Sequence, residues 1–310
     1  MSKSIRPLAL TFAVASLLAA CAVGTWDLIV EHPDPFTGVA ASVDGEIVYG
    51  LREGLIFAYD QDSGAPIGDN LDLWHYPDAL AITGAPSHPN TAWSLHDEGI
   101  HRWAFDSYWT DAMYPVESIA LPGDGVDVLY DLTVDSTGDI YLATGLYPAP
   151  GQNQYSILLY RWRPINGQWD AAVWTTWYTS NPLNVRLTAD PAGTNIFLAA
   201  NGQIFDLDPT TLWIDNQVQM DGTEHVSDFM DIDAYGGLIL AVGRDNASRG
   251  YQGAVGLFEP DGDEVAWDTN FGYPIHSTHM TNQSRSGDVK AWMTPQTAYT
   301  GQIWSTVVGS

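Results

Sequence analysis

The sequence is poor in cysteine and in lysine. Cys21 is the only cysteine among 310 residues, and Lys290 is the only lysine that follows it. A domain that begins after Cys21 therefore has no disulfide and no cysteine-ligated metal, and its packed core must hold it together. Basic residues are scarce overall, with 11 Lys and Arg against 38 Asp and Glu and a net charge of −27. Such a surface repels phosphate backbones, which argues against nucleic acid as a partner.

Long hydrophobic runs are also scarce, and the one that stands out is close to the beginning of the chain. It covers residues 7–20, behind Lys3 and Arg6. The run is too short to cross a bilayer core as an untilted helix. A basic start, a short apolar stretch and small residues before a cleavage point are typical of a secretory signal. We therefore expect residues 1–20 to be removed and residues 21–310 to form the mature domain.

The four residues Leu18-Ala19-Ala20-Cys21 resemble the lipobox of bacterial lipoproteins. The resemblance implies that the signal is cut before Cys21 and that this cysteine carries the lipid. Multiple acyl chains give stable anchoring to a membrane. Ala22 is not the aspartate that this family links to inner-membrane retention, so the resemblance favours the outer membrane, on its periplasmic or surface face. The alternative is an ordinary secretory signal with an incidental cysteine.

Processing would make the charge more negative. All 38 acidic residues follow Cys21 whereas Lys3 and Arg6 precede it, so the net charge falls from −27 to −29. Anionic lipid headgroups would be repelled, which leaves the anchor as the membrane contact. The partners that suit this charge are cations, basic proteins and neutral glycans. The alternative is that the charge serves solubility alone, as in a saline habitat.

Helical periodicity is essentially absent beyond the signal, and six copies of a strand pattern take its place. Turns recur near Gly45, Asn90, Gly138, Gly193, Gly236 and Gly287, at successive spacings of 45, 48, 55, 43 and 51 residues. An apolar strand precedes each turn, and two more follow it. The strands that directly follow the turns are predicted at 46–51, 91–96, 139–145, 195–202, 237–243 and 289–294. A near-constant period of this length is the mark of a radial or solenoid architecture.

The pattern predicts an all-β fold, a six-bladed β-propeller. The last repeat stops after its third strand, while residues 25–30 form a strand with no repeat of their own. We expect this N-terminal strand to complete the last blade, which closes the ring and removes an exposed edge. A sandwich, a solenoid or a different number of blades are the alternatives.

Two stretches resemble known propeller repeats. Residues 59–64, Tyr-Asp-Gln-Asp-Ser-Gly, resemble a turn of quinoprotein repeats, and residues 132–143 resemble repeats of the NHL group. The resemblance implies a propeller and no more, because the regular tryptophan signature of quinoproteins is missing. No quinone cofactor follows from it, and kinship of fold alone does not carry a function.

Long insertions point to one face of the propeller as a binding surface. They cover residues 146–155, 244–253 and 295–302 and connect second to third strands. Long loops in a compact domain are more often functional than short ones. Their aromatic and basic side chains suit stacking on sugars or contact with a peptide. These side chains are Tyr147, Tyr155, Arg244, Arg249, Tyr251 and Tyr299.

Polar residues at the starts of the first strands form a second candidate site, at the mouth of the central channel on the same face. The spacing His-x-x-Asp occurs twice, entering blades two and five, and polar residues occupy the equivalent place in blades three, four and six. The candidates are His75, Asp78, Asp131, Arg186, His225, Asp228 and His276. Such a cluster can hold a divalent cation or a polar ligand. The alternative for each residue alone is a structural role, because connector residues commonly bond nearby backbone. His276 and His279 are three apart on a predicted strand, so they point to opposite faces and cannot chelate one ion together.

Two functions follow from these features. The favoured one is a non-enzymatic, lipid-anchored binding or assembly protein of the bacterial envelope that presents its loop face to a protein or glycan. The alternative is a calcium-dependent hydrolase or lactonase, in which Asp78, Asp131 and Asp228 would ligate a metal at the channel mouth. No nucleophile elbow, zinc-binding helix motif or phosphate-binding glycine loop occurs in the sequence.

Overall fold

The fold is taken from a computed structural model of the chain. The structure describes residues 23–42, 45–68, 70–73, 77–85, 88–104, 115–123, 126–147, 154–178, 184–191, 195–200, 202–218, 226–245, 252–269, 271–282, 288–295 and 300–308. Cys21 and the expected signal lie outside these residues, as do His75, His225 and Tyr251.

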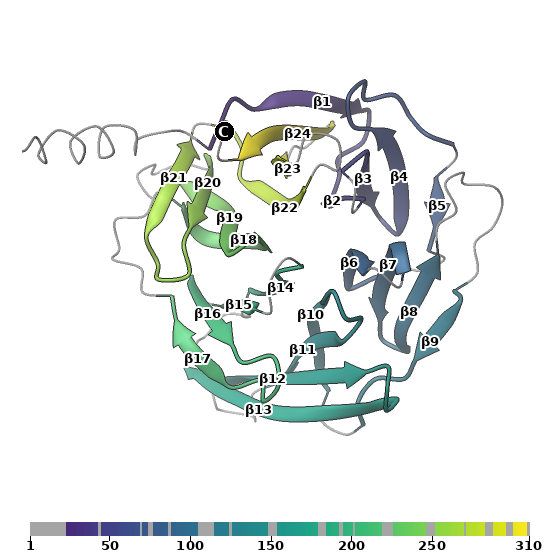
Figure 1. Ribbon diagram of the computed structural model, residues 1–310, viewed down its shortest axis with the longest axis vertical. Helices are drawn as coiled ribbons and strands as arrows, with labels where there is room; N and C mark the ends of the chain where they lie inside the picture. Colours follow the sequence, from purple (N-terminus) through teal and green to yellow (C-terminus); the bar gives the residue numbers. More distant parts are fainter. Residues whose placement is uncertain are drawn as a thin grey trace, which may run out of the picture.

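Six four-stranded antiparallel sheets form a ring around a central channel, which is the predicted six-bladed propeller (Figure 1). Every described element is a β-strand. Blade 1 contains β2 (Gly38–Ala41), β3 (Ile47–Arg52), β4 (Leu55–Asp60) and β5 (Leu71–Asp72). Blade 2 contains β6 (Ala79–Ala85), β7 (His88–His96), β8 (Gly99–Ala104) and β9 (Glu117–Ile119). Blade 3 contains β10 (Val128–Val134), β11 (Ile140–Leu146), β12 (Gln154–Arg163) and β13 (Gln168–Tyr178).

The second half of the ring repeats this plan. Blade 4 contains β14 (Val185–Ala189), β15 (Ile196–Ala200), β16 (Gln203–Leu207) and β17 (Ile214–Gln217). Blade 5 contains β18 (Val226–Tyr235), β19 (Leu238–Asp245), β20 (Gly253–Phe258) and β21 (Glu264–Thr269). Blade 6 contains β22 (Ile275–Asn282), β23 (Val289–Pro295) and β24 (Gly301–Val308), and β1 (Asp27–His32) pairs with β24 as its outermost strand.

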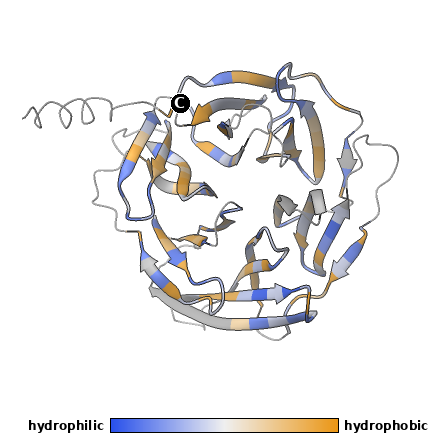
Figure 2. Cartoon of the chain, viewed as in Figure 1, coloured by the Kyte–Doolittle hydropathy of each residue, from blue (hydrophilic) through white to orange (hydrophobic). Residues whose placement is uncertain are grey.

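Apolar side chains pack between neighbouring blades rather than in one central core. The buried residues fall into six clusters, and each cluster joins the facing sheets of two adjacent blades. Figure 2 shows apolar segments recurring around the whole ring. Strands buried on both faces carry continuous apolar runs, as in β15 and β20, where every residue is buried. The six interfaces hold the first strand of each blade in place around the channel.

The junction between blades 6 and 1 uses residues from distant parts of the chain. Val30 of β1 is buried in one cluster with Trp292 and Ile303 of blade 6 and with residues of blade 1. Lys290 of β23 donates a hydrogen bond to Gln61 in the turn after β4. Gly64 ends that turn at φ 66°, and a Cβ atom there would lie 2.0 Å from the carbonyl oxygen of Ile29. Only glycine fits this close approach of blade 1 to β1.

Candidate functional site

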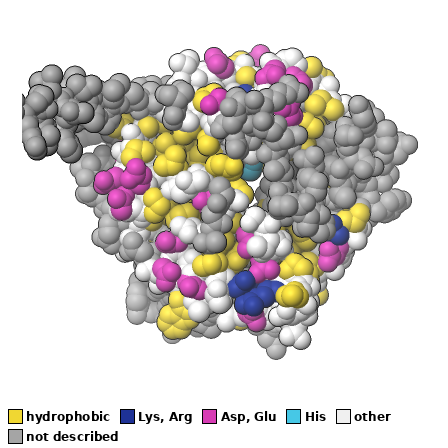
Figure 3. All heavy atoms as spheres, viewed as in Figure 1, with side chains coloured by type: hydrophobic (Ala, Val, Ile, Leu, Met, Phe, Trp, Pro, Cys, Tyr) yellow, Lys and Arg dark blue, Asp and Glu magenta, His cyan; other side chains and the backbone are white. Residues whose placement is uncertain are grey.

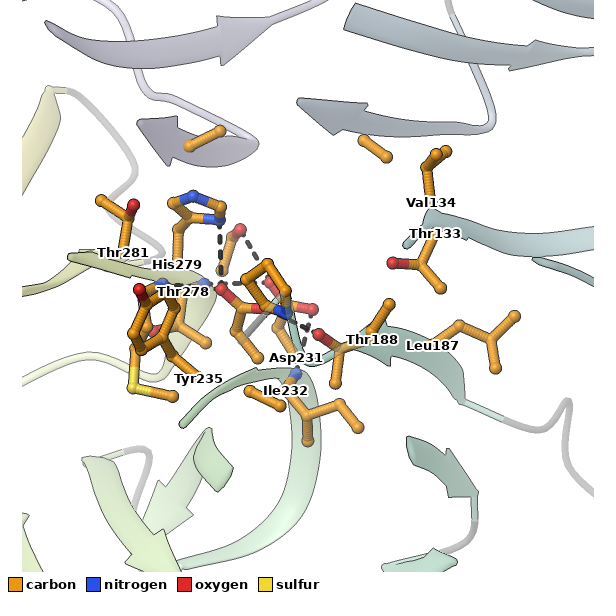
Figure 4. Close-up of a pocket in the computed structure, with 18 of the residues that line it drawn as sticks. Thr133, Val134, Leu187, Thr188, Asp231, Ile232, Tyr235, Thr278, His279 and Thr281 are labelled. Carbon is orange, nitrogen blue, oxygen red and sulfur yellow. Dashed lines mark hydrogen bonds and ion pairs between the residues drawn. The ribbon is translucent and has the colours of Figure 1, made fainter. Parts of the chain in front are cut away.

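A cavity of about 350 Å³ occupies the central channel. Its walls come from the first strands of all six blades, namely β2, β6, β10, β14, β18 and β22 (Figure 4). It extends along these strands from Asp131 and Asp231 to the residues that follow their C-terminal ends, such as Ser136 and Pro191. A volume of this size lies at the lower end of pockets that take small organic molecules, roughly 300–1,000 Å³.

The wall of the cavity differs from one side to the other. Blades 1 and 2 contribute small apolar side chains, namely Val39, Ala40, Ala41 and Ala81. Blades 3 to 6 contribute carboxylates, hydroxyls and an imidazole, among them Asp131, Thr133, Asp231, Asp233 and His279. The sequence makes this asymmetry, because β2 reads Gly-Val-Ala-Ala whereas β18 carries Asp231 and Asp233 on alternate positions. Alternate residues of a strand point to the same side, so both carboxylates can reach the channel.

Asp131 of blade 3 bonds to the backbone of blade 4. Its Oδ2 accepts a hydrogen bond of 2.8 Å from the Leu187 amide, and its Oδ1 accepts one of 2.9 Å from the Leu132 amide. The same arrangement recurs between blades 5 and 6, where Asp231 Oδ2 accepts from the Thr278 amide at 2.9 Å and from Ser277 Oγ at 2.8 Å. Aspartates on the inner strands thus tie adjacent blades together.

Asp233 forms the next layer of the channel. Its Oδ2 accepts a hydrogen bond of 2.6 Å from the Met280 amide, and its Oδ1 accepts one of 2.6 Å from Thr188 Oγ1. His279 Nδ1 lies 3.1 Å from the same Oδ2. Figure 4 shows the His279 ring with its other nitrogen directed away from this carboxylate. Because Thr188 comes from blade 4 and His279 from blade 6, Asp233 connects three blades.

Arg186 is close to both Asp131 and Asp231. Its Nε is 3.9 Å from Asp231 Oδ1 and donates a hydrogen bond of 2.9 Å to the Met230 carbonyl. Burial raises the pKa of Asp131 to about 7, and the Asp231 charge adds to the rise while Arg186 opposes it. Burial likewise raises the pKa of Asp231, again opposed by Arg186. One guanidinium thus acts on two buried carboxyl groups, and it opposes the rise that burial causes in the pKa of each.

The structure brings together some of the predicted site residues and separates others. Asp131, Arg186 and His276 are neighbours, because Arg186 acts on the pKa of both other groups. Burial lowers the pKa of His276, and its buried Nδ1 has no hydrogen-bond partner. Asp78 is not part of this group, because it does not line the channel cavity. Burial and the nearby Asp97 raise the pKa of its carboxyl group.

Other predicted residues give less information. Asp228 lies within β18, and its side chain is outside the described part, as are His75, His225 and Tyr251. Arg244 is exposed at the end of β19, away from the channel cavity. His279 lines the cavity and His276 does not, in agreement with the opposite directions expected for them.

Sequence reasoning missed three central residues of the channel, Asp231, Asp233 and Thr133. All three lie on the apolar strands that the pattern predicted before the turns near Gly138 and Gly236. A signal was available, because carboxylates two residues apart on an apolar inner strand must both face the same side. Thr188 and His279 add to the same layer, so the polar part of the site extends further along the channel than the predicted mouth.

One of the loops predicted to bind partners begins at a residue, Tyr147, whose backbone amide is hydrogen-bonded. We call the face of the propeller at which the second strand of each blade ends the connector face. Strand β11, for example, ends there at Leu146. Tyr147 follows β11 on this face and is 65 % exposed, and its amide donates to Asp127 Oδ2 at 3.1 Å. Residues 148–153 of this loop, 246–251 of the next and 296–299 of the third lie outside the described part.

The described residues contain no group of three or more His, Cys, Asp or Glu side chains arranged to hold a metal ion. They also contain no helix of the length and apolarity needed to cross a membrane. Figure 3 shows acidic side chains spread over the described part of one face, with few basic ones, and a hollow near the middle with a histidine beside it.

Comparison with known proteins does not add a function. A scan against models of protein families found no match, and a search of curated proteins found no significant match. The conclusions about function therefore rest on the residues and the geometry of the propeller itself.

Proposed function

We propose that the protein is a lipid-anchored binding or assembly protein of the bacterial envelope, which presents its connector face to a protein or a glycan. The observation that carries the proposal is Tyr147. Its ring is 65 % exposed, although its backbone is fixed by Asp127. A large, exposed aromatic side chain on an ordered backbone is the kind of group that anchors a partner at low entropic cost.

The channel carboxylates support a binding role over a catalytic one. Every oxygen of Asp131, Asp231 and Asp233 accepts a hydrogen bond from the protein, and four of the six accept one from an adjacent blade. These groups are therefore engaged in holding the blades in register. A rigid ring with an aromatic loop at its face is suited to binding without a change in shape.

The membrane anchor belongs to the same proposal. Cys21 precedes β1, and β1 is the outermost strand of blade 6. We propose that cleavage before Cys21 leaves β1 in place as the closing strand, with the lipid attached at the rim of the ring. Replacing Cys21 by serine should abolish labelling with radioactive palmitate and release the protein from the membrane fraction. Retained label or an unchanged membrane fraction would contradict the anchor.

Photo-crosslinking tests the binding face. A photoreactive phenylalanine analogue at position 147 is compared with the same residue at position 213. Trp213 is a matched control because it is 69 % exposed and lies in the turn between β16 and β17, at the opposite end of its sheet. In intact cells, position 147 should give a defined crosslinked product with an envelope protein or glycan, and position 213 should not. Equal products from both positions, or none from position 147, would refute the connector face as the binding surface.

A calcium-dependent hydrolase or lactonase is the second candidate, and Asp131 is the observation in its favour. A carboxyl group with a pKa of about 7 beside a cavity can take up and release protons at neutral pH. The described residues do not, however, assemble three ligands for calcium. A metal that binds only the folded state raises the melting temperature by mass action. A higher midpoint in calcium than in EDTA would favour the hydrolase, and an unchanged midpoint would remove it.

A further inference from the structure

We propose that the channel cavity binds a small primary amine, with its ammonium group among the carboxylates of blades 3 to 5 and its alkyl part against blades 1 and 2. This site is separate from the connector face. The proposal of an amine site therefore does not depend on the partner proposed for the connector face.

The charge of the lining selects for a cation. Asp131, Asp135, Asp231 and Asp233 line the cavity, and no Lys or Arg is among its described lining residues. Arg186 is close to Asp131 and Asp231, but one guanidinium does not neutralise the set. The net charge of the chain is negative, as is the charge of the cavity lining, so the channel concentrates cations and excludes anions.

Thr133 indicates that the cavity takes a hydrogen-bond donor. Its side chain is only 9 % exposed and lines the cavity, and its hydroxyl makes no hydrogen bond to another described residue. Figure 4 shows the Thr133 hydroxyl directed toward the centre of the cavity. The hydroxyl oxygen is therefore available to a ligand in the cavity that donates a hydrogen bond to it.

The carboxylates offer acceptors to the same ligand. Each oxygen of Asp131 accepts one protein hydrogen bond and so keeps a free lone pair. An ammonium group carries three donors and no acceptor, which matches a lining of carboxylates and a hydroxyl. The cavity is also larger than a bare ion needs, since it measures about 350 Å³.

The opposite wall is suited to a short alkyl chain. Val39, Ala40, Ala41 and Ala81 bring small apolar side chains to the cavity from blades 1 and 2. An amine with a few methylene groups places its charge at the acidic wall and its chain at this apolar one. A purely polar ligand such as a free sugar would leave the apolar wall without a complementary surface.

Binding should be linked to the proton of Asp131. Its pKa is about 7, while an alkylammonium remains charged well above that, with a pKa of roughly 10. Below pH 7 the amine must displace a proton from Asp131, so affinity should rise between pH 6 and pH 8. The charged groups around Asp131 are Arg186 and Asp231, with Asp233 and His279 in the next layer.

The test is calorimetric titration of the full-length protein with butylamine at pH 8 in 150 mM NaCl. 1-Butanol is the neutral molecule of the same length. The amine should bind at one site per chain, and the alcohol should bind at least tenfold more weakly. Equal binding of the two, or no saturable binding of the amine, would overturn the proposal. Calcium chloride at the same ionic strength forms a third arm, and tighter binding of calcium would also overturn it.

Variants distinguish the cavity from general attraction to an acidic protein. Thr133→Val keeps the shape of the side chain and should weaken butylamine binding about tenfold, because a hydrogen bond to a charged group is lost. Thr133→Ser retains the hydroxyl and should bind within about twofold of the wild type. Glu259→Gln removes one exposed charge far from the cavity and should also have little effect. Equal weakening by Thr133→Val and Glu259→Gln would refute the site.

Discussion

At the scale of the residue, Asp131 joins blades 3 and 4 through hydrogen bonds, and its carboxyl group also titrates near neutral pH. Its two oxygens accept amide hydrogen bonds from blades 3 and 4, which would favour the charged form. Burial is the larger effect and raises its pKa to about 7. The carboxyl group is thus a structural tie that changes charge within the physiological range.

The free energy of unfolding should therefore fall as pH rises through the range set by Asp131. The pKa in the folded state, about 7, is above the ordinary value of 3.8. Between these values the folded state holds a proton that the unfolded state has released, so raising the pH destabilises the fold. A rise of this size corresponds to about 4 kcal/mol between pH 4 and pH 8.

Urea unfolding at pH 5 and pH 8, on the wild type and on Asp131→Asn, measures this contribution. The asparagine cannot ionise, so the loss of stability between the two pH values should be smaller in the variant by several kcal/mol. The Glu259→Gln variant controls for a change in one exposed carboxylate. An equal pH dependence in Asp131→Asn and the wild type would show that Asp131 does not carry it.

At the scale of the element, one turn carries avoidable strain. Glu53 and Gly54 connect β3 to β4 with φ angles of 46° and 80°, so both are in the left-handed region. This geometry suits the dipeptide Asn-Gly. For a residue such as glutamate, the left-handed conformation costs roughly 1 kcal/mol of conformational free energy. Glu53 is exposed and makes only a 3.8 Å contact with Arg52.

Glu53→Asn should therefore stabilise the protein by about 0.5–1 kcal/mol. Asparagine tolerates the left-handed region, and little is lost with an exposed ion pair. The measurement is the urea midpoint of the variant against the wild type. Glu53→Ala removes the same charge without relieving the strain, and a stabilisation as large in Glu53→Ala would assign the effect to charge.

Strand β1, the outermost strand of blade 6, offers a second test at this scale. Val30 is buried between β1, blade 6 and blade 1, whereas Leu28 on the same strand is 43 % exposed. Val30→Ala should cost about 2 kcal/mol because it removes two buried methyl groups and leaves a cavity. Leu28→Ala should cost less than about 0.5 kcal/mol. Thermal or urea unfolding of the two variants checks the difference, and similar losses would show that β1 contributes little to the junction.

The strands were predictable because their signals are local. Turn residues and apolar runs located the first three strands of every blade, as with residues 289–294 for β23. Fourth strands gave weaker signals. The apolar stretches at 116–122 and 264–269 predict the strands observed as β9 and β21, whereas β5 has only two residues, too few for a periodicity. Asp131 and Arg186 were predicted near the channel, but their partner Asp231 was not. Which face of an inner strand lines the channel depends on how the blades pack, and that is not encoded in any one strand.

At the scale of the whole molecule, the ring has six similar interfaces and a large negative charge. No disulfide holds it, since Cys21 is the only cysteine. The net charge of −27 is distributed around a closed structure, and the described part of the face in Figure 3 shows acidic residues in most regions. Repulsion among these charges is relieved when the chain unfolds, so it opposes the apolar packing between blades.

Salt should therefore stabilise this protein. The screening length falls from about 30 Å at 0.01 M to about 10 Å at 0.1 M ionic strength and about 3 Å at 1 M, so repulsion weakens most in the first part of this range. We expect the melting temperature at pH 8 to rise steeply with sodium chloride up to about 0.2 M and more slowly above it. Differential scanning calorimetry measures the midpoint, and potassium chloride should give the same curve because screening depends on charge rather than on the ion. A midpoint that is flat or falls below 0.2 M would mean that the ion pairs and carboxylate ties of the folded ring outweigh the repulsion among its acidic residues.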